Sequence, residues 1–320
     1  MINLLTGQGT PLVAFLGILF AFFCTCIFTA KCSKYLPKDM GRAFAVDGKL
    51  SAGKPRGAGI IFIFVFTAAA LLFSDISIEF VIYIALVVVE MLTGYLDDAS
   101  DKPWGELKKG ILDLVVAVIG AVTYVHFNSS TVNFAIFGQQ ITLPPAVYVI
   151  LAVLLIWASI NVTNCSDGVD GLSGTLTLVT LMSIYVISRI LKENDTFPYL
   201  ILLFAVCILG YLWYNATPSV LLMGDAGSRA MGIFIAIAIM KTGSPFLYLL
   251  VALVMILDGG LGLLKVALLR TTKLHILKNV RTPLHDHARK VMGWSNTQTV
   301  FRFAIIQIVI CAATIYLLLL

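Results

Sequence analysis

The sequence predicts an all-α integral membrane protein of about ten transmembrane helices, organised as a single domain over residues 1–320. The composition is the first observation behind this prediction. Hydrophobic residues make up 59% of the chain and charged residues 12%, and the mean hydropathy is +0.97. An average soluble domain is roughly 45–50% apolar and about 25% charged. The second observation is that apolar runs of about 17–25 residues, long enough to cross a bilayer as helices, recur along the whole chain.

These apolar runs predict where the helices lie. The expected spans are 11–30, 59–74, 79–96, 111–126, 144–160, 173–190, 199–214, 229–241, 246–268 and 299–319. No basic residue precedes the first run, which favours a transmembrane helix over a cleaved signal peptide. The stretch 127–145 alternates in polarity and predicts at most a small hairpin or a surface turn.

The distribution of Lys and Arg predicts the orientation of the bundle. Most of them fall in three loops, 31–56, 102–109 and 270–290. The loops on the opposite side hold little beyond Arg189, Lys192 and Lys241. Because basic loops stay in the cytoplasm, both termini are expected outside. The net charge of +5 is then explained by membrane topology and requires no nucleic-acid partner.

The polar motifs fall on the predicted cytoplasmic side. They are GKPRGAG at 53–59, YLDDASD at 95–101, NVTNCSDGVDGL at 161–172, NATPSVLLMGDAGS at 215–228 and TPLHDHARKVMGW at 282–294. Asp167 and Asp170 lie between apolar flanks that offer no water to a carboxylate. These aspartates therefore belong at a membrane face or in a wet cavity.

Several acidic residues crowd one predicted helix end. Asp97 and Asp98 end the helix, and Glu90 lies about two turns earlier on roughly the same face. Adjacent carboxylates repel one another unless a cation lies between them, so the pair is either a ligand site or a solvated helix end. Glu90 faces the bundle interior or a wet cavity, or pairs with a basic residue for structure.

Asp225 is followed by small residues that open a helix with exposed amides, a pattern that suits phosphate beside a Mg²⁺-binding carboxylate. Lys109 is either a phosphate contact or a membrane-edge anchor. His285 and His287 belong to the same site or to a solvated loop; they lack the ligands for zinc, and the acidic surroundings favour Mg²⁺. The six cysteines show no metal-ligand spacing. Together the motifs predict a membrane enzyme acting on a phosphorylated substrate at the cytoplasmic face.

The motifs YLDD, NxxNxxDGxDGL, NxxPxxxxMGDxGS and PLHDH followed by GW resemble the polyprenyl-phosphate N-acetylhexosamine-phosphate transferase superfamily. Within it, the chain is most similar to the phospho-N-acetylmuramoyl-pentapeptide translocase (MraY) family, over almost its whole length. The resemblance implies transfer of phospho-MurNAc-pentapeptide from UDP-MurNAc-pentapeptide to undecaprenyl phosphate, with Mg²⁺, releasing UMP and forming lipid I. It also implies a multi-pass protein of the bacterial cytoplasmic membrane, acting in the lipid bilayer as a homodimer.

The resemblance further implies roles for individual residues. Asp225 would be the Mg²⁺ ligand, and Asp97 and Asp98 would lie beside the diphosphate. Lys109, with Asp113 where the family usually has Gln, would face the phosphates. The candidate catalytic residues are Asp97, Asp98, Lys109, Asp167, His285 and His287. The candidate substrate-binding residues are Lys49, Lys54, Asn164, Gly168, Val169, Asp170, Asn215, Leu222 and Ser228.

Three departures from the family pattern keep alternatives open. Leu222 stands where a Phe commonly stacks on uracil. Without that stacking partner, the free energy of binding the base would be weaker by on the order of 1 kcal/mol. Lys54 and Arg56 stand where threonines are expected, and they either add phosphate contacts or mark a different loop. Asp286 replaces the central histidine of the late motif. The alternative substrate is therefore UDP-N-acetylglucosamine or a related UDP-sugar.

Two further alternatives concern mechanism and class. The lipid phosphate attacks directly, or an aspartate such as Asp98 attacks first in a two-step route. A secondary transporter would use intramembrane acids such as Glu90 and Asp258 together with broken helices. The transporter is disfavoured because most polar residues cluster at one end of the spans and not at the bilayer midplane.

Overall fold

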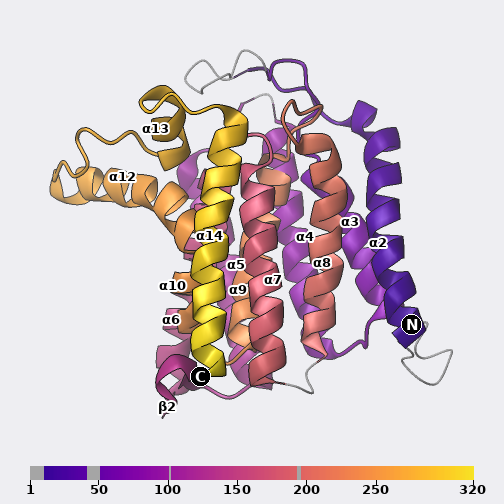
Figure 1. Ribbon diagram of the computed structural model, residues 1–320, viewed down its shortest axis with the longest axis vertical. Helices are drawn as coiled ribbons and strands as arrows, with labels where there is room; N and C mark the ends of the chain where they lie inside the picture. Colours follow the sequence, from indigo (N-terminus) through magenta and orange to yellow (C-terminus); the bar gives the residue numbers. More distant parts are fainter. Residues whose placement is uncertain (1–10, 42–50, 101, 193–195) are drawn as a thin grey trace.

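The computed structural model describes residues 11–41, 51–100, 102–192 and 196–320. Its long helices run side by side in one bundle (Figure 1). They are α2 (Pro11–Cys32), α3 (Gly59–Phe73), α4 (Ile78–Asp98), α5 (Glu106–Phe127), α6 (Pro145–Cys165), α7 (Leu172–Leu191), α8 (Phe197–Asn215), α9 (Gly224–Lys241) and α14 (Asn296–Leu319). The shorter segments between α9 and α14 are η3 (Pro245–Leu247), α10 (Tyr248–Val251), α11 (Leu253–Met255), η4 (Ile256–Gly260), α12 (Leu261–Thr272) and α13 (Leu284–Lys290).

Among the described residues, seven helices are long and apolar enough to cross a membrane: α2, α4, α5, α6, α7, α8 and α14. This confirms the class of integral membrane protein. α3 is apolar but shorter. The run predicted at 246–268 is not one straight helix, because the chain bends by 71° between Pro245–Val251 and Leu253–Thr272. The π-helical η4 follows the bend, and Gly259 lets it approach α6, since a side chain there would meet the Val162 carbonyl.

α9 lies at the centre of the bundle. Each of its residues from Gly224 to Lys241 is buried, and it packs against α3, α4, α6 and α7. Aromatic rings fill part of the interior: Phe234 of α9 stacks on Phe204 of α8, with ring centroids 4.2 Å apart. The burial of α9 on all sides means that its charged residues must find partners within the protein.

The last turn of α9 defines one end of the bundle. There the Lys241 ammonium lies 3.1 Å from Glu79 Oε1 and donates to Asn128 Oδ1 at 2.9 Å. The predicted hairpin in 127–145 is confirmed as two short antiparallel strands, β1 (Thr131–Phe134) and β2 (Gln139–Thr142).

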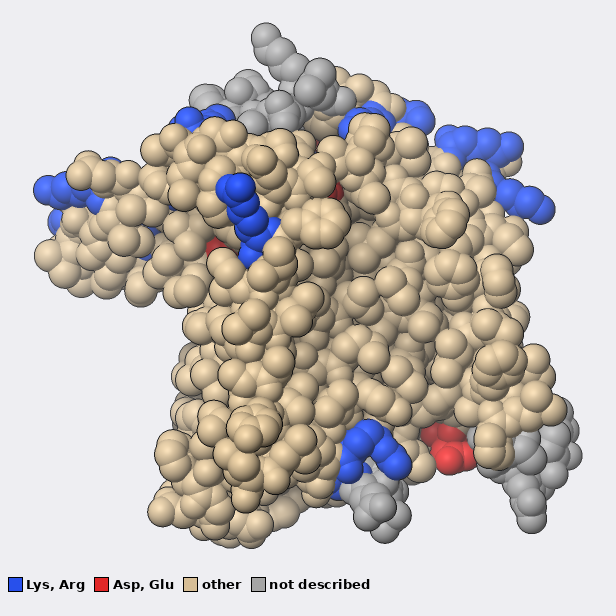
Figure 2. Space-filling view, viewed as in Figure 1, with Lys and Arg blue, Asp and Glu red and all other residues tan. Residues whose placement is uncertain are grey.

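α2 begins and α14 ends at the lower end of the bundle in Figure 1, whereas α12 and α13 lie toward the upper end. Figure 2 shows Lys and Arg side chains gathered at the upper end, including over the protruding α12. A broad belt of uncharged surface separates the two ends on this face. In the described part of the chain, the basic residues therefore gather mainly at one end of the molecule, as the sequence predicts.

Candidate active site

Three helix ends bring the predicted acidic residues together. α4 ends with Asp97 and Asp98, α5 carries Lys109 in its first turns, and α9 begins just before Asp225. The Lys109 ammonium bridges two of these helices, because it pairs with Asp97 and donates to Asp225 Oδ2 at 2.9 Å. Asp98 Oδ2 accepts from the backbone N–H of Ala226 at 3.1 Å, so it lies at the exposed amides of the α9 N-terminus.

Two glycines permit this convergence. Gly94 allows α4 to contact the first turn of α9, because a Cβ there would collide with the Asp225 backbone. Gly224 has a φ of +71°, which favours glycine, and a side chain there would meet the Asp98 carboxylate. The carboxylates thus approach one another because backbone, and not side chain, fills the space between their helices.

Arg56, from the loop before α3, completes the cluster. Its Nε donates to Asp98 Oδ1 at 2.8 Å, its Nη1 donates to Asp39 Oδ1 at 3.4 Å, and its Nη2 lies 3.7 Å from Asp225 Oδ1. Burial lowers the pKa of the Arg56 guanidinium, but the carboxylates of Asp98, Asp225 and Asp39 outweigh this, and the pKa is raised above its usual value. Arg56 is therefore a permanent cation.

We call these six residues the carboxylate cluster: Asp39, Asp97, Asp98, Asp225, Arg56 and Lys109. Its ion pairs join four carboxylates to two cations, which leaves it two positive charges short. A hard divalent cation suits both this charge and the all-oxygen donor set. Within the described ranges, no three His, Cys, Asp or Glu residues form a ready-made cage for a metal. Mg²⁺ commonly takes only one or two carboxylates and completes its shell with water and substrate phosphate, so the residues fit it.

The predicted asparagines hold the surrounding loops. Asn164 Nδ2 donates to Ser228 Oγ at 2.9 Å, and Ser228 Oγ donates to the Gly224 carbonyl at 3.1 Å. Asn215 Oδ1 accepts from the Gly171 N–H at 2.8 Å. Asn164 and Ser228 thus brace the turn that carries Asp225, while Asn215 ties α8 to the loop after α6.

A second predicted group lies beside the same loop. Asp170 is 3.7 Å from the Lys54 ammonium and accepts from the Ser219 N–H at 3.3 Å. Lys54 also donates to Ser219 Oγ at 3.0 Å. Leu222 is held through its backbone: its N–H donates to the Pro55 carbonyl at 2.8 Å, and its carbonyl accepts from the Ala58 N–H at 3.1 Å.

α13 packs against the loop after α6, which holds Asp167 and the buried Val169. His285 Nδ1 pairs with Asp258 Oδ2 at 2.8 Å, and Gly168 faces the other side of the ring, where a side chain would collide with Nε2. His287, also on α13, instead accepts from the N–H of Arg281, in the segment just before this helix, at 3.2 Å. Of the predicted site residues, Lys49 lies outside the described ranges.

The sequence did not reveal the partners beneath this site. Asp113, expected to face the phosphates, is only 2% exposed and pairs with Arg229. Arg229 Nη2 also lies 3.1 Å from Glu90 Oε2, and Asn161 Nδ2 donates to Asp113 at 3.2 Å. Arg229 could have been predicted from the sequence, because a charged residue at the edge of an apolar run needs a buried partner of opposite charge.

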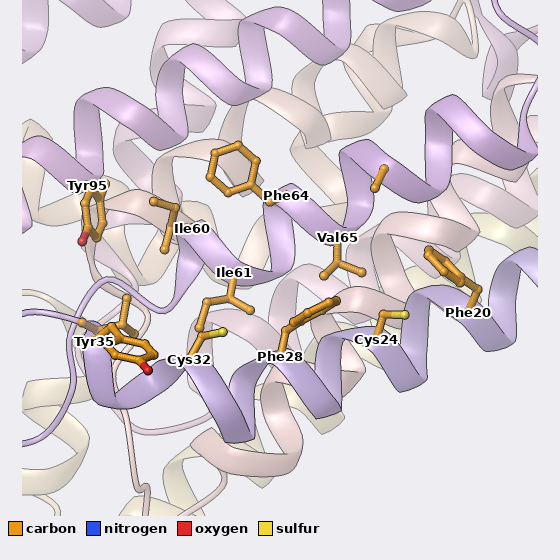
Figure 3. Close-up of a pocket in the computed structure, with 12 residues that line it drawn as sticks. Phe20, Cys24, Phe28, Cys32, Tyr35, Ile60, Ile61, Phe64, Val65 and Tyr95 are labelled. Carbon is orange, nitrogen blue, oxygen red and sulfur yellow. The ribbon is translucent and has the colours of Figure 1, made fainter.

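An apolar cavity of about 420 Å³ lies between α2 and α3 (Figure 3). It is lined by Phe20, Cys24, Phe28, Cys32, Tyr35, Leu36, Ile60, Ile61, Phe64, Val65, Ala68 and Tyr95. Tyr95 of α4 also packs beside Gly57, next to Arg56. The lining is suited to hydrocarbon, and one end of the cavity borders the carboxylate cluster.

Comparison with known proteins identifies the family. The family model described as glycosyl transferase family 4 matches residues 80–243. A phospho-N-acetylmuramoyl-pentapeptide-transferase of Treponema pallidum (strain Nichols) is 42% identical over 292 residues, covering 86% of this chain and 80% of that protein. A protein of the same name from Clostridium acetobutylicum is 28% identical over 269 residues, covering 81% of this chain and 83% of the relative. The chain belongs to the phospho-N-acetylmuramoyl-pentapeptide-transferase family.

Proposed function

We propose that this protein transfers phospho-MurNAc-pentapeptide from UDP-MurNAc-pentapeptide to undecaprenyl phosphate, releasing UMP and forming lipid I. The carboxylate cluster is the observation that carries the proposal, because its paired cations and excess of carboxylates, at one end of a membrane bundle, suit phosphoryl transfer. The relative from Treponema pallidum bears the name of this activity.

In the reaction, an oxygen of undecaprenyl phosphate forms a bond to the sugar-linked phosphorus. The bond between that phosphorus and the oxygen bridging to the uridine-linked phosphate breaks, and its electron pair leaves with UMP. The Lys109 ammonium, held between Asp97 and Asp225, supplies positive charge where the phosphates bind. The Asp97 carboxylate is itself fixed by the Trp104 N–H at 2.6 Å.

The hydrogen bonds of Asp98 favour direct attack over a two-step route. Both of its oxygens already accept hydrogen bonds, one from Arg56 and one from the Ala226 N–H. An Asp98 oxygen that bonded to phosphorus would lose most of its negative charge, and the hydrogen bond that it accepts would weaken. Direct attack by the lipid phosphate leaves both in place, and Asp97 and Asp98 then act as bases or electrostatic partners.

Asp225 is the residue that would hold Mg²⁺, which would neutralise charge on the diphosphate as UMP departs. Hydrogen bonds of Asn164 and Ser228 hold the turn that carries Asp225 in place for this role. Gly168, Val169 and Asp170 then border the uridine from the loop after α6, and Asp167 organises the centre together with Asn164.

The proposed topology has ten spans: α2 to α9, the bent segment from η3 to α12, and α14. The carboxylate cluster faces the cytoplasm and both termini lie outside. The gathering of Lys and Arg at the end that carries the cluster supports this orientation (Figure 2). The protein is accordingly a multi-pass protein of the bacterial cytoplasmic membrane, and its assembly as a homodimer stays a prediction.

Release of UMP by the purified full chain in detergent, with undecaprenyl phosphate and Mg²⁺, tests the proposal. We expect turnover with UDP-MurNAc-pentapeptide and none with UDP-N-acetylglucosamine. Arg270→Gln is a matched control, since Arg270 is exposed and pairs only with the exposed Glu106 among the described residues. Turnover with UDP-N-acetylglucosamine alone would favour the alternative substrate, and inactivity with both donors would contradict the proposal.

A further inference from the structure

The backbone around Arg56 is fixed from two sides. On one side, the segment Pro55 to Gly59 is hydrogen-bonded to residues 222–223: the Ala58 N–H donates to the Leu222 carbonyl and the Gly59 N–H to the Met223 carbonyl, both at 3.1 Å. On the other side, the Arg56 N–H donates to the Pro37 carbonyl at 2.8 Å. Since residues 222–223 directly precede the helix that carries Asp225, the position of Arg56 is tied to that of Asp225.

The guanidinium is oriented as well. Asp39, which accepts from Arg56 Nη1, is itself held by Ser51 Oγ at 2.6 Å and the Gly41 N–H at 3.1 Å. A guanidinium carries five N–H donors, and hydrogen bonds to the described residues use two groups, Nε and Nη1. Its Nη2 points toward Asp225 at 3.7 Å, a distance longer than a hydrogen bond. The Arg56 side chain keeps 19% of its surface accessible.

We propose that Arg56 is a catalytic residue that binds the diphosphate of the nucleotide substrate and stabilises the negative charge that develops as UMP leaves. This inference rests on the proposed function. A phosphate engaged at Asp225 lies next to the guanidinium, whose planar fork matches two phosphate oxygens. Because the fork is held before substrate arrives, it stabilises developing charge without reorganisation.

Lys54, two residues earlier in the same loop, does not lie beside the carboxylates of Asp98 and Asp225. The Lys54 ammonium turns to Asp170 and Ser219, beside the nucleotide loop. Arg56 alone of the two contacts Asp98 and Asp225 within the described structure. The competing role for Arg56 is structural, as a counter-ion that only offsets repulsion between these carboxylates.

Substitution Arg56→Ala, with chemical rescue, separates the two roles. The full chain in detergent is assayed for UMP release and for its thermal midpoint, with and without millimolar guanidinium ion, beside Arg270→Gln. We expect Arg56→Ala to lower kcat about 10³-fold, the lower range for an arginine acting on a transferring phosphate. We expect guanidinium to restore part of kcat while leaving the thermal midpoint unchanged, and Arg270→Gln to behave as the unsubstituted chain.

Two results would overturn the inference. One is a kcat for Arg56→Ala near that of the unsubstituted chain. The other is a loss of kcat that follows a fall in the thermal midpoint and that guanidinium does not reverse. If the unsubstituted chain and Arg270→Gln both fail to release UMP from either donor, the proposed function fails instead, so the two failures are distinguishable.

Discussion

The same three helices, α4, α5 and α9, carry two layers of charged side chains that differ in how their charges are balanced. Arg229 lies four residues after Asp225, and Asp113 four residues after Lys109, so each lies one helical turn below a member of the carboxylate cluster. The lower layer, formed by Glu90, Asp113 and Arg229, pairs α9 with both neighbours. The upper layer opens toward the end of the bundle.

The lower layer is sealed. The exposed fractions of Glu90, Asp113 and Arg229 are 0%, 2% and 2%. No ligand reaches such a layer, where one cation, Arg229, pairs with two carboxylates, Glu90 and Asp113. The upper layer carries two carboxylates more than its cations and retains accessible surface at Arg56 and Lys109. The difference teaches that similar residues, one turn apart, hold the bundle together in one layer and, under the proposed function, bind a charged ligand in the other.

Asp225→Asn should produce the largest effect on activity. We expect kcat for UMP release to fall at least about 10³-fold, because the substitution removes the carboxylate proposed to hold Mg²⁺ at the developing charge. The thermal midpoint should change little: Asp225 gives up its ion pair with Lys109 and one repelling charge is lost at the same time, while Lys109 still pairs with Asp97 and Arg56 with Asp98. A marked loss of thermal stability would mean that the upper layer is structural too.

Arg229→Leu should affect mainly the stability of the fold, whereas Asp225→Asn affects mainly kcat. Removing one partner of a buried ion pair leaves uncompensated charge and costs about 3–5 kcal/mol of unfolding free energy. Thermal unfolding in detergent measures the change. The triple variant with Glu90→Leu and Asp113→Leu should regain most of the loss, because no buried charge is then left unpaired. A single variant as stable as the parent chain would refute the structural assignment of this layer.

Mg²⁺ should stabilise the upper layer only. A ligand that binds the folded state at 100 times its dissociation constant adds about 2.7 kcal/mol. We therefore expect added Mg²⁺ to raise the thermal midpoint of the parent chain and of Arg229→Leu, but not that of Asp225→Asn. The same rise in all three proteins would show that the cation binds elsewhere.

Arg270→Gln should have the smallest effect. Arg270 and Glu106 form an ion pair on the surface, with the side chains 64% and 79% exposed. Water screens such a pair, so neither kcat nor the thermal midpoint should change measurably. A clear change would imply that this surface of α12 contacts something during turnover.

The apolar runs predicted the helices well because a membrane helix must be apolar over its whole span. The boundaries were less accurate where helices begin with polar residues. The apolar run 229–241 omits the first turn of α9, where Gly224 to Ser228 is small and polar, and only the motif around Asp225 predicted that a helix opens there. The run 111–126 omits the first turns of α5 with Lys109. These missed turns are the ones that carry the site.

The motifs identified Asp97, Asp98 and Asp225, but their pairing is a tertiary property. Lys109 and Asp225 are 116 positions apart, and no local pattern states which carboxylate a lysine will meet. The contact of Asp258 with His285 and the layer around Arg229 were hidden for the same reason. Residue types predict the chemistry of a site, whereas helix packing decides its partners.

The complete burial of α9 has a consequence for how the protein meets membranes of different thickness. Helices at the rim, such as α2, with only 22% of its apolar window buried, must adapt to the lipid by tilting or by deforming the bilayer. α9 is enclosed by protein from Asp225 to Lys241, so its vertical position is set by its neighbours. The carboxylate cluster therefore keeps its place relative to the neighbouring helices when the rim helices adapt to a thinner or thicker bilayer.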